Sequence, residues 1–330
     1  MKHANVSIFI PHNGCPNQCS FCNQKNITGI NNQPTPEEVY SILESASQNL
    51  KYSSKDSQIA FFGGSFTAID EKYMVSLLKV ASKFLVNGTF NGIRISTRPD
   101  AINEHILEIL KSYGVNAIEL GAQSMCEDVL LANKRGHSSL DVKMASHLIK
   151  KKNFSLGLQM MTGLYKSSFE KDLYTANEIV KLSPDTVRIY PTVVMKNTML
   201  CELYLNGEYV PMDFDSTVKL CSELLMLFSK NHIKVIRLGL HDSDSLKENM
   251  VAGVFHPSFC EICKSQVIFD KTLNELKNRA LKYAVIKVNP STVSQFLGNK
   301  KSNFKKFCDM GYSLKILQDK NVKVGDIIIV

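Results

Sequence analysis

The sequence lacks any apolar run of the roughly 18 residues that a membrane-spanning helix needs. Its apolar stretch near the N-terminus, residues 6–11, is too short to be the core of a secretory signal peptide. Both absences lead us to expect a soluble, cytoplasmic protein with no membrane partner. The chain has 330 residues, of which 44% are hydrophobic, and a chain of that size and composition can bury a large core.

The sequence also lacks a fourth cysteine close to Cys15, Cys19 and Cys22. Structural zinc sites and ferredoxin-type clusters take four protein ligands, so three thiols leave one metal position open for a substrate or cosubstrate. The nine cysteines are odd in number and three are bunched, which does not resemble a disulfide scaffold. We therefore expect the bunched cysteines to be catalytic metal ligands. The alternative is a zinc knuckle completed by His12.

Excess charge is missing from most of the chain. Residues 264–330 hold 13 Lys or Arg against 5 Asp or Glu, a net charge of +8 that equals the net charge of the whole chain. The first 263 residues therefore sum to zero. A basic C-terminal segment can attract polyanions such as RNA. The alternative is a solvated, lysine-rich surface, because the lysines are dispersed among apolar residues.

No low-complexity linker interrupts the chain, and β-rich segments alternate with amphipathic helical segments. A helix is predicted over residues 33–50, where Thr35 can cap it, Pro36 fits the first turn and Glu38 completes a capping box. Further helices are expected to begin near Asp70, Asn103, Ser139, Ser167 and Asp215. Strands are predicted over residues 6–11, 58–62, 92–96, 117–121, 155–161, 186–190 and 234–238. This repeated βα pattern indicates parallel strands with right-handed crossovers.

The pattern predicts an α/β fold in which residues 1–250 form a partial barrel of the (βα)6 type. Residues 251–330 are expected to form a small basic module that completes or covers the barrel, with strand-like YAVIKV and DIIIV segments between residues 267 and 330. In a parallel βα barrel, catalytic groups follow the C-terminal ends of the strands. The cysteines and several Gly, Thr and Arg segments follow six or seven predicted strands, so we expect one site at that mouth.

The cysteine motif resembles the signature of the radical S-adenosylmethionine (SAM) superfamily. The spacing is Cys15-x3-Cys19-x2-Cys22, with the aromatic Phe21 before the last cysteine. Within that superfamily the chain resembles the elongator catalytic subunit and its short bacterial relatives. The matching segments run in order from about residue 6 to residue 240 and include FFGGSFTAI, ISTRPDAI, IELGAQSM, NKRGH, MMTGL and RIYPTVVMKNTMLCELYLNGEY.

The resemblance implies two cofactors, a 4Fe-4S cluster and SAM. Cys15, Cys19 and Cys22 would hold three irons, and the fourth iron would take the amino and carboxylate groups of SAM. An external low-potential donor would supply the electron that cleaves SAM to methionine and a 5′-deoxyadenosyl radical, which abstracts hydrogen from the substrate. The protein would orient the reactants and exclude water and oxygen.

The resemblance also implies a set of SAM-binding residues. The Gly63-Gly64 pair would let the backbone approach the methionyl group, while Gln123 and Arg135 match residues that contact the SAM carboxylate and ribose in the coproporphyrinogen-oxidising branch. Arg135 could instead be a surface cation. Ser96 and Gln159 replace acidic residues of that branch, although they can still bond a ribose. The full expected set is Phe21, Gly63, Gly64, Ser65, Ser96, Gln123, Arg135, Gln159, Met161 and Tyr190.

Four further residues are candidates for substrate contact: Asp100, Glu119, His241 and Asp242. Glu119 lies on a strand expected to line the barrel, where a buried carboxylate is costly unless it is paired. The alternative for Glu119 is therefore a structural pair with Arg94 or Arg188. The alternative for His241 and Asp242 is a solvated loop after the last strand.

The cysteine pair Cys260 and Cys263 could bind metal or support a redox step, or the two could be ordinary thiols, since no second such pair lies nearby. The remaining cysteines, Cys126, Cys201, Cys221 and Cys308, are expected to be core or incidental residues.

Three functions follow from these observations. The elongator subunit also carries a tRNA-binding extension and an acetyltransferase domain, and neither is expected here, because the chain starts 14 residues before Cys15 and shows no glycine-rich acetyl-CoA loop after residue 250. We therefore expect a radical SAM enzyme acting on a nucleobase-like small molecule, with queuine lyase, which releases 7-aminomethyl-7-deazaguanine from queuine, as the implied activity. A tRNA-modifying radical SAM enzyme is the alternative that the basic tail supports. A non-catalytic iron-sulfur or zinc-binding module is the third.

Overall fold

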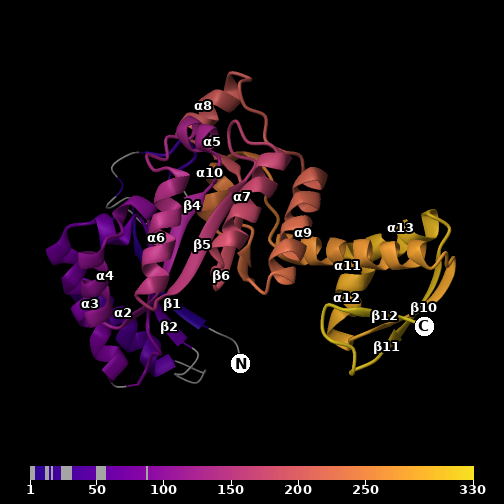
Figure 1. Ribbon diagram of the computed structural model, residues 1–330, viewed down its shortest axis with the longest axis horizontal. Helices are drawn as coiled ribbons and strands as arrows, with labels where there is room; N and C mark the ends of the chain where they lie inside the picture. The colour runs from indigo at the N-terminus through magenta and orange to yellow at the C-terminus, as the bar shows by residue number, and fades with distance from the viewer. Residues whose placement is uncertain (1–3, 12–14, 16–17, 24–31, 50–56, 87) are drawn as a thin grey trace.

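The computed structural model describes residues 4–11, 15, 18–23, 32–49, 57–86 and 88–330. Its largest sheet has seven strands in the order β1-β2-β3-β4-β5-β6-β8, all parallel. The strands are β1 (Ala4–Ile10), β2 (Ser57–Gly63), β3 (Ile93–Thr97), β4 (Val115–Gln123), β5 (Ser155–Thr162), β6 (Thr186–Pro191) and β8 (Lys234–Leu238). With β1 and β8 at its two edges, the curved sheet is a partial barrel (Figure 1). The α/β partial barrel expected from the sequence is confirmed.

The helices that connect the strands cover the sheet on its outer side (Figure 1). They are α2 (Pro36–Asn49), α3 (Glu71–Val86), α4 (Glu104–Ser112), α5 (Glu127–Ala132), α6 (Ser139–Lys151), α7 (Phe169–Leu182) and α9 (Phe214–Lys230). The predicted capping box begins α2, because Thr35 N donates to Glu38 Oε2 at 2.8 Å and Glu38 N donates to Thr35 Oγ1 at 3.2 Å. Satisfying these two backbone donors fixes where the helix starts.

One core fills the space between the sheet and these helices. The central strands are buried on both faces, as expected of a parallel sheet with helical crossovers. Fully buried members include Phe61, Leu77, Ile93 and Phe228. Each such side chain contributes about 1.5 to 3 kcal/mol relative to an exposed one. The core therefore holds the strands, and the loops at their carboxyl ends, in fixed positions.

Short elements lie over the carboxyl ends of the strands. Strands β7 (Val193–Met195) and β9 (Met250–Gly253) form an antiparallel pair, and α10 (Asp244–Asn249) leads directly into β9. Helix α8 (Met199–Leu205) follows β7 and lies at the top of the view in Figure 1. Val194, Leu200 and Tyr209 form a small apolar cluster there, against which Phe21 packs. This cluster brings the cysteine segment under the cover of β7 and α8.

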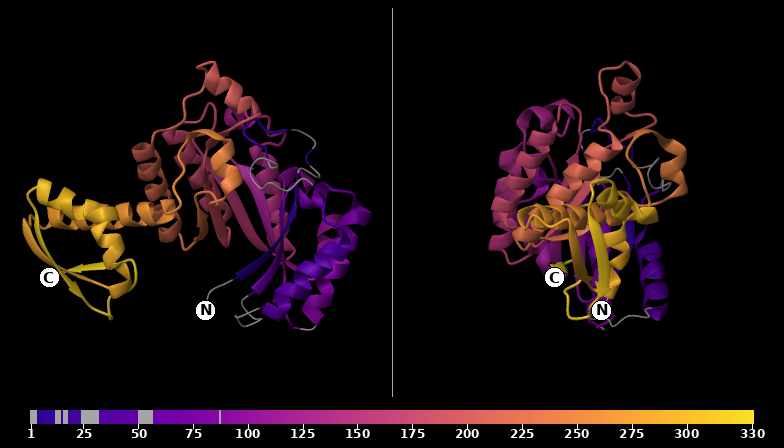
Figure 2. Two further views of the ribbon diagram at one scale, coloured as in Figure 1. Left: turned by 180° about the vertical axis from the view of Figure 1, so that it is seen from behind. Right: turned by 90° about the vertical axis from the view of Figure 1, so that its right-hand side faces the viewer.

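The C-terminal elements form a second core. They are α11 (Phe259–Asn278), β10 (Tyr283–Val288), α12 (Val293–Leu297), α13 (Ser302–Asp309), β11 (Ser313–Gln318) and β12 (Ile327–Ile329). Their strands form a separate sheet in the order β11-β10-β12, so they add no strand to the barrel. Figure 2 shows this unit at the far end of α11, beyond α9.

Helix α11 belongs to both cores. Phe259 and Cys263 pack in the barrel core, whereas the second core begins at Ile268. We therefore propose that the division between the two units lies within α11 rather than between residues 250 and 251. Among the described residues, no helix is long and apolar enough to cross a membrane.

Candidate functional site

The segment that carries Cys19 and Cys22 is tied to two distant parts of the chain. Ser20 N donates to Asn133 O at 3.1 Å and Ser20 Oγ donates to Asn133 Oδ1 at 2.7 Å. Leu200 N, at the start of α8, donates to Ser20 O at 2.8 Å. Ser20 and Asn133 are both fully buried. These contacts hold the cysteine segment against the mouth of the barrel without help from the thiols.

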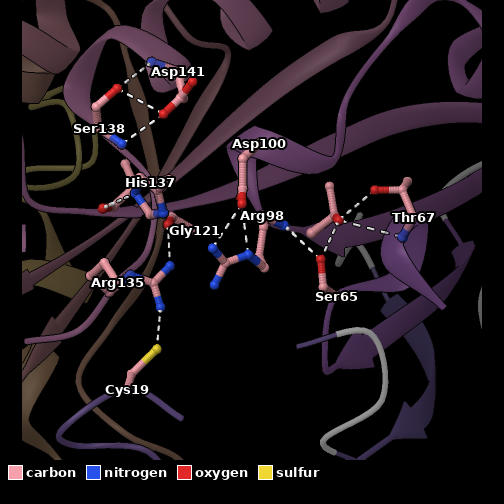
Figure 3. A network of polar contacts seen from close by, with 12 residues as sticks. Cys19, Ser65, Thr67, Arg98, Asp100, Gly121, Arg135, His137, Ser138 and Asp141 are labelled. Carbon is pink, nitrogen blue, oxygen red and sulfur yellow. Dashed lines mark hydrogen bonds and ion pairs between the residues drawn. The ribbon is translucent and has the colours of Figure 1, made fainter. Parts of the chain in front are cut away.

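Arg135 binds the Cys19 thiol directly, as Figure 3 shows. Its Nη1 donates to Cys19 Sγ at 2.9 Å and its Nη2 donates to Gly121 O, at the end of β4, at 2.7 Å. Arg135 and Cys19 are each only 7% exposed. The alternative that Arg135 is a surface cation is therefore wrong. The Arg135 guanidinium also lies over the Phe21 ring, 5.9 Å from its centroid.

A second guanidinium lies close by. Arg98, which follows β3, is 4% exposed, and it binds Asp100 through two parallel bonds, Nε to Oδ1 at 2.9 Å and Nη2 to Oδ2 at 2.8 Å (Figure 3). Its third nitrogen, Nη1, is buried and has no hydrogen-bond partner among the described residues. Asp100, a candidate for substrate contact, is thus engaged by Arg98.

Both arginines act on the candidate cluster ligands. Burial raises the pKa of the Cys15 thiol and the charge of Cys19 adds to this, while Arg98 and Arg135 oppose the rise. Metal binding requires thiolates, so cations beside these cysteines favour the form that binds iron. Within the described residues, no three His, Cys, Asp or Glu side chains are gathered as a metal site. His12, the alternative fourth zinc ligand, lies outside the described residues.

The ends of β2 and β3 are joined by hydroxyl groups. Ser65 Oγ and Thr97 Oγ1 are 2.8 Å apart, Thr67 Oγ1 is 2.6 Å from Thr97 Oγ1, and Arg98 N donates to Ser65 Oγ at 3.1 Å (Figure 3). The expected SAM-binding Ser65 therefore positions the backbone of Arg98. This network fixes the direction in which Arg98 leaves β3.

The glycine pair has a packing role within the chain. Gly63 has φ +117, and a Cβ there would lie 2.5 Å from Ile10 O on the neighbouring strand β1. Gly64 N donates to the same oxygen at 2.6 Å. The close approach that we expected between this backbone and SAM is thus observed between β2 and β1. Contact of the pair with SAM stays a prediction.

Gln123 ends β4 in a conformation that side chains rarely adopt. Its φ is +65, and the register of β4 with β5 shifts between Gly121 and Gln123. Gln123 Oε1 is buried without a partner among the described residues. Strained residues of this kind cluster at ligand sites.

The partnerless polar atoms fit the groups that SAM carries. A buried polar atom that the protein leaves unpaired is costly, so it indicates a missing partner. Arg98 Nη1 and Arg135 Nε are donors for a carboxylate, whereas Gln123 Oε1 and Ser96 Oγ can bond an ammonium or a ribose hydroxyl. With the three thiols, this donor set suits an iron-sulfur cluster and a zwitterionic cosubstrate.

Glu119 has several partners within the protein. It is 1% exposed, and its carboxylate meets Arg94 Nη1 at 2.9 Å and Arg188 Nε at 2.7 Å. Gln159 Nε2 donates to the same carboxylate at 3.2 Å. The structural pair expected for Glu119 is thus observed, with both arginines, and contact of Glu119 with a substrate stays a prediction. Gln159 thus joins this ion cluster, and its expected contact with the SAM ribose stays a prediction.

The remaining candidates are more scattered. His241 and Asp242 follow β8 and are exposed, and Asp242 pairs with Lys247 at 2.6 Å, while their contact with a substrate stays a prediction. Met161 and Tyr190 are half-buried on β5 and β6. Their contact with SAM stays a prediction.

Cys260 and Cys263 lie on α11. The neighbouring Cys221 and burial raise the pKa of Cys263, and burial raises the pKa of Cys260. Cys263 is fully buried in the barrel core, as an ordinary thiol would be.

His137 is a site residue that the sequence reasoning missed. It is 7% exposed, its Nε2 lies 3.3 Å from Ala122 O, and its Nδ1 has no partner among the described residues. Burial, reinforced by the charge of Arg135, lowers the pKa of His137 to about 4. The imidazole is therefore neutral at physiological pH. Asn133 and His137 lie in the segment NKRGH on either side of Arg135, an expected SAM-binding residue. This proximity in the sequence could have identified both as site residues.

Comparison with known proteins gives the following matches. Residues 9–176 match the radical SAM superfamily and residues 184–267 match the radical SAM C-terminal domain. Elongator complex protein 3 of Homo sapiens is 30% identical over 185 residues, which are 50% of this chain and 34% of that protein. The tRNA uridine(34) acetyltransferase of Methanocaldococcus infernus is 34% identical over 131 residues, which are 39% of this chain and 24% of that protein. The chain thus spans about a third or less of the length of these relatives.

Solved structures share the fold at low sequence identity. The archaeal Methanocaldococcus infernus Elp3 with an N-terminal deletion gives a TM-score of 0.64 at 22% identity, covering 84% of this chain and 63% of that one. Methylornithine synthase gives a TM-score of 0.50 at 15% identity, covering 91% and 85%. Both likenesses concern the fold alone.

Proposed function

This chain belongs to the radical SAM superfamily, and from that premise we propose that it abstracts a hydrogen atom from a nucleobase-like substrate at the mouth of the partial barrel. The superfamily uses a 4Fe-4S cluster and SAM, which depend on an external low-potential electron donor. When bound, these groups supply the 5′-deoxyadenosyl radical that abstracts hydrogen. The residues of this chain bind the cofactors, orient them and exclude water.

The observation that carries the proposal is the pair of buried guanidinium groups beside the cysteines. Arg135 donates to Cys19 at 2.9 Å, and Arg98 keeps one buried nitrogen without a partner among the described residues. In this arrangement Cys15, Cys19 and Cys22 would hold iron, and the free nitrogens of the two arginines would meet the carboxylate of SAM. Neutral His137 adds no further positive charge to a region that already holds two cations.

The first candidate substrate is free queuine. After hydrogen abstraction from the cyclopentenediol ring, the reaction would break the bond between the ring carbon and the aminomethyl nitrogen. The ring would leave with one additional double bond, and the nitrogen would take one electron from the external donor and one proton from solvent to give 7-aminomethyl-7-deazaguanine. A deazaguanine and a diol need several polar partners inside a mostly apolar pocket. Thr162 Oγ1 and Thr192 Oγ1 are buried and have no partner among the described residues, and they lie at and just after the ends of β5 and β6. We assign these two hydroxyls to the substrate.

A base held in tRNA is the second candidate. Two observations favour it: the similarity to a tRNA uridine(34) acetyltransferase and the excess of lysine in the last 67 residues of the chain. The same hydrogen-abstraction chemistry would then act on a base presented by a folded RNA. The two candidates differ in how the substrate arrives, not in the cofactors used.

Product analysis separates the candidates. The reconstituted enzyme is incubated anaerobically with SAM, a reductant and either queuine or queuosine-containing tRNA, and the products are identified by mass spectrometry. We expect 7-aminomethyl-7-deazaguanine and 5′-deoxyadenosine from the free base, and neither product from the variant in which Cys15, Cys19 and Cys22 are Ala. An altered tRNA base with intact queuine would replace the first candidate by the second. If neither substrate reacts while SAM is still cleaved, the nucleobase proposal fails.

A further inference from the structure

The last part of the chain, residues 279–330, is called the basic module here. It contains ten Lys or Arg and three Asp, a net charge of +7. Two of the three Asp are engaged in ion pairs: Asp319 lies 3.6 Å from Lys287 and Asp326 lies 3.4 Å from Lys271. Most cations of the basic module therefore have no ion-pair partner among the residues that the structure describes.

The basic module does not need these lysines in order to fold. Its core is apolar, with Phe296 and Phe307 fully buried and their rings 6.1 Å apart. Two lysines lie over rings, Lys282 over Tyr312 and Lys306 over Phe269. Lys300, Lys301 and Lys305 are exposed and form no ion pair in this fully described part of the chain. They are left available to an external anion.

The turn between α12 and α13 displays these lysines in a fixed geometry. Gly298 has φ +76, and a Cβ there would come within 2.6 Å of Ser302 Oγ. Lys300 and Lys301 both have positive φ, +50 and +61. Buried Asn303 holds the turn in place by donating to Ser265 O at 3.0 Å on α11 and to Phe296 O at 3.3 Å. The two adjacent cations are thus pre-organised rather than carried on a loose loop.

The open face of the small sheet adds an aromatic side chain. Ala284, Ile286 and Val288 of β10 point into the core, so Tyr283, Val285 and Lys287 point away from it. Tyr283 is 61% exposed. Lys315 on β11 is exposed and lies opposite Val285 in the register, so it shares this face with Tyr283. An exposed ring beside cations on a sheet is how several RNA-binding modules stack a base while holding its phosphates.

From this charge and geometry we infer that the basic module docks single-stranded RNA. Lys300, Lys301 and Lys305 bind consecutive phosphates, and a glycine-containing turn between two helices serves this purpose in other RNA-binding modules. Tyr283 stacks on a base. A membrane surface fits the turn less well, because binding to lipid needs large apolar side chains beside the cations, and Asn299 and Ser302 flank the lysine pair instead. Leu317 and Ile328 are exposed on the open face of the sheet, so lipid vesicles are an arm of the test.

The inference concerns binding and goes beyond the proposed reaction. It holds whether the reacting base is free or part of an RNA. Cleavage of SAM by the barrel and docking of RNA by the basic module are separate properties, so either can fail without the other.

The test is a titration of a fluorescein-labelled, unmodified tRNA anticodon stem-loop with the full chain, repeated over a range of salt concentrations. In the test variant Lys300 and Lys301 become Asn, which tolerates positive φ, and Lys305 becomes Gln. The matched control loses the same charge on α3, at the opposite end of the molecule in Figure 1, through Lys72→Gln, Lys79→Gln and Lys83→Gln. Melting temperatures establish that each variant is folded.

We expect the test variant to bind at least about tenfold more weakly at low salt. The slope of log affinity against log salt should also fall by about 2, because three phosphate contacts to a single strand are lost. The α3 variant should retain the affinity and the slope of the unaltered protein. Equal weakening in both variants would mean that net charge alone attracts RNA and would overturn the assignment of the turn.

Tyr283→Ser gives an independent readout. It removes the ring without changing charge, so affinity should fall by about five- to 150-fold with the salt slope unchanged. Unchanged affinity would remove the sheet face from the docking surface. Binding to phosphatidylserine vesicles through the same three lysines, without measurable RNA binding, would overturn the inference in favour of a membrane partner.

Discussion

Several charged side chains of the barrel are buried and paired, whereas most of those in the basic module are exposed and form no ion pair among the described residues. Glu119 is 1% exposed and lies between Arg94 and Arg188, and Arg98 is fixed by Asp100. Residues 279–330 carry a net charge of +7 on their surface. Buried charges act over short distances on groups already in place, while exposed charges act on partners arriving through solvent and are screened by salt. If both proposals hold, the same residue types serve chemistry in one unit and docking of a partner in the other.

The largest effect is expected at the cysteines of the barrel. Changing Cys15, Cys19 and Cys22 together to Ala should abolish the 4Fe-4S cluster, because no other cysteine precedes β2. Iron and sulfide content and the cluster's absorbance after anaerobic reconstitution measure this. The matched control is Cys126→Ala with Cys308→Ala, which should keep the full cluster. A 4Fe-4S cluster that still forms in the triple variant would contradict the assignment of these three cysteines as its ligands.

Removing the carboxylate of Glu119 should produce the largest loss of stability. Glu119→Ala leaves Arg94 and Arg188 without their shared partner in a buried site, so the free energy of unfolding should fall by about 3 to 5 kcal/mol. Denaturant titration measures it. Glu275→Ala is the exposed counterpart, because Glu275 pairs with Arg279 on α11, and it should cost at most about 1 kcal/mol. Similar losses at the two positions would erase the contrast between buried and exposed pairs.

Acid should destabilise the barrel through His137. Its folded pKa is lowered to about 4, below the ordinary value of 6.5, so the unfolded chain binds more protons between these values. The stability that depends on His137 staying neutral is fully present above pH 6.5. It is lost as pH falls towards 4, and the free energy of unfolding should fall by about 3 kcal/mol over this range. Unfolding measured across this range should show a shallower pH dependence in His137→Asn than in the unaltered chain. Exposed His147→Asn is the control, and an equal slope in all three proteins would contradict the burial argument.

Arg135 is expected to give the smallest of these effects. Arg135→Ala should weaken SAM binding roughly ten- to 150-fold, as loss of a charge-assisted bond costs about 1.5 to 3 kcal/mol. Loss of the hydrogen bond to Cys19 should also lower the reduction potential of the cluster, because bonds to the sulfurs tune it. Calorimetry with SAM and a redox titration followed by electron paramagnetic resonance measure the two effects. A lowered reduction potential with unchanged SAM affinity would mean that Arg135 acts on the Cys19 thiol and does not contact SAM.

Local signals in the sequence predicted local structure. The capping box at Thr35 and Glu38 needs only residues three apart, and it was found as predicted. The alternating βα pattern likewise predicted a parallel sheet, because a helix between two successive strands lets both strands run in the same direction. The Arg98 and Asp100 pair lies two residues apart and could have been found in the same way.

Long-range pairing was harder to predict. For Glu119 the sequence left open either substrate contact or a structural pair with an arginine. Its two arginine partners lie 25 and 69 residues away, on strands whose register the sequence does not state. Asn133 reaches Ser20 across 113 residues, so its role in holding the cysteine segment was missed. A side chain whose partner is brought near only by the assembled sheet carries no local signal of that contact.

The continuous helix α11 sets a length between the two units. It has 20 residues and therefore spans about 30 Å at 1.5 Å per residue. Its first turns are packed in the barrel core and its later turns in the second core, so the two units are joined by packed helix rather than by a flexible linker. A partner that touches both units must bridge a distance fixed by backbone hydrogen bonds. If an RNA docked at the basic module also carries the reacting base, the fixed length of α11 would determine which nucleotide reaches the barrel mouth.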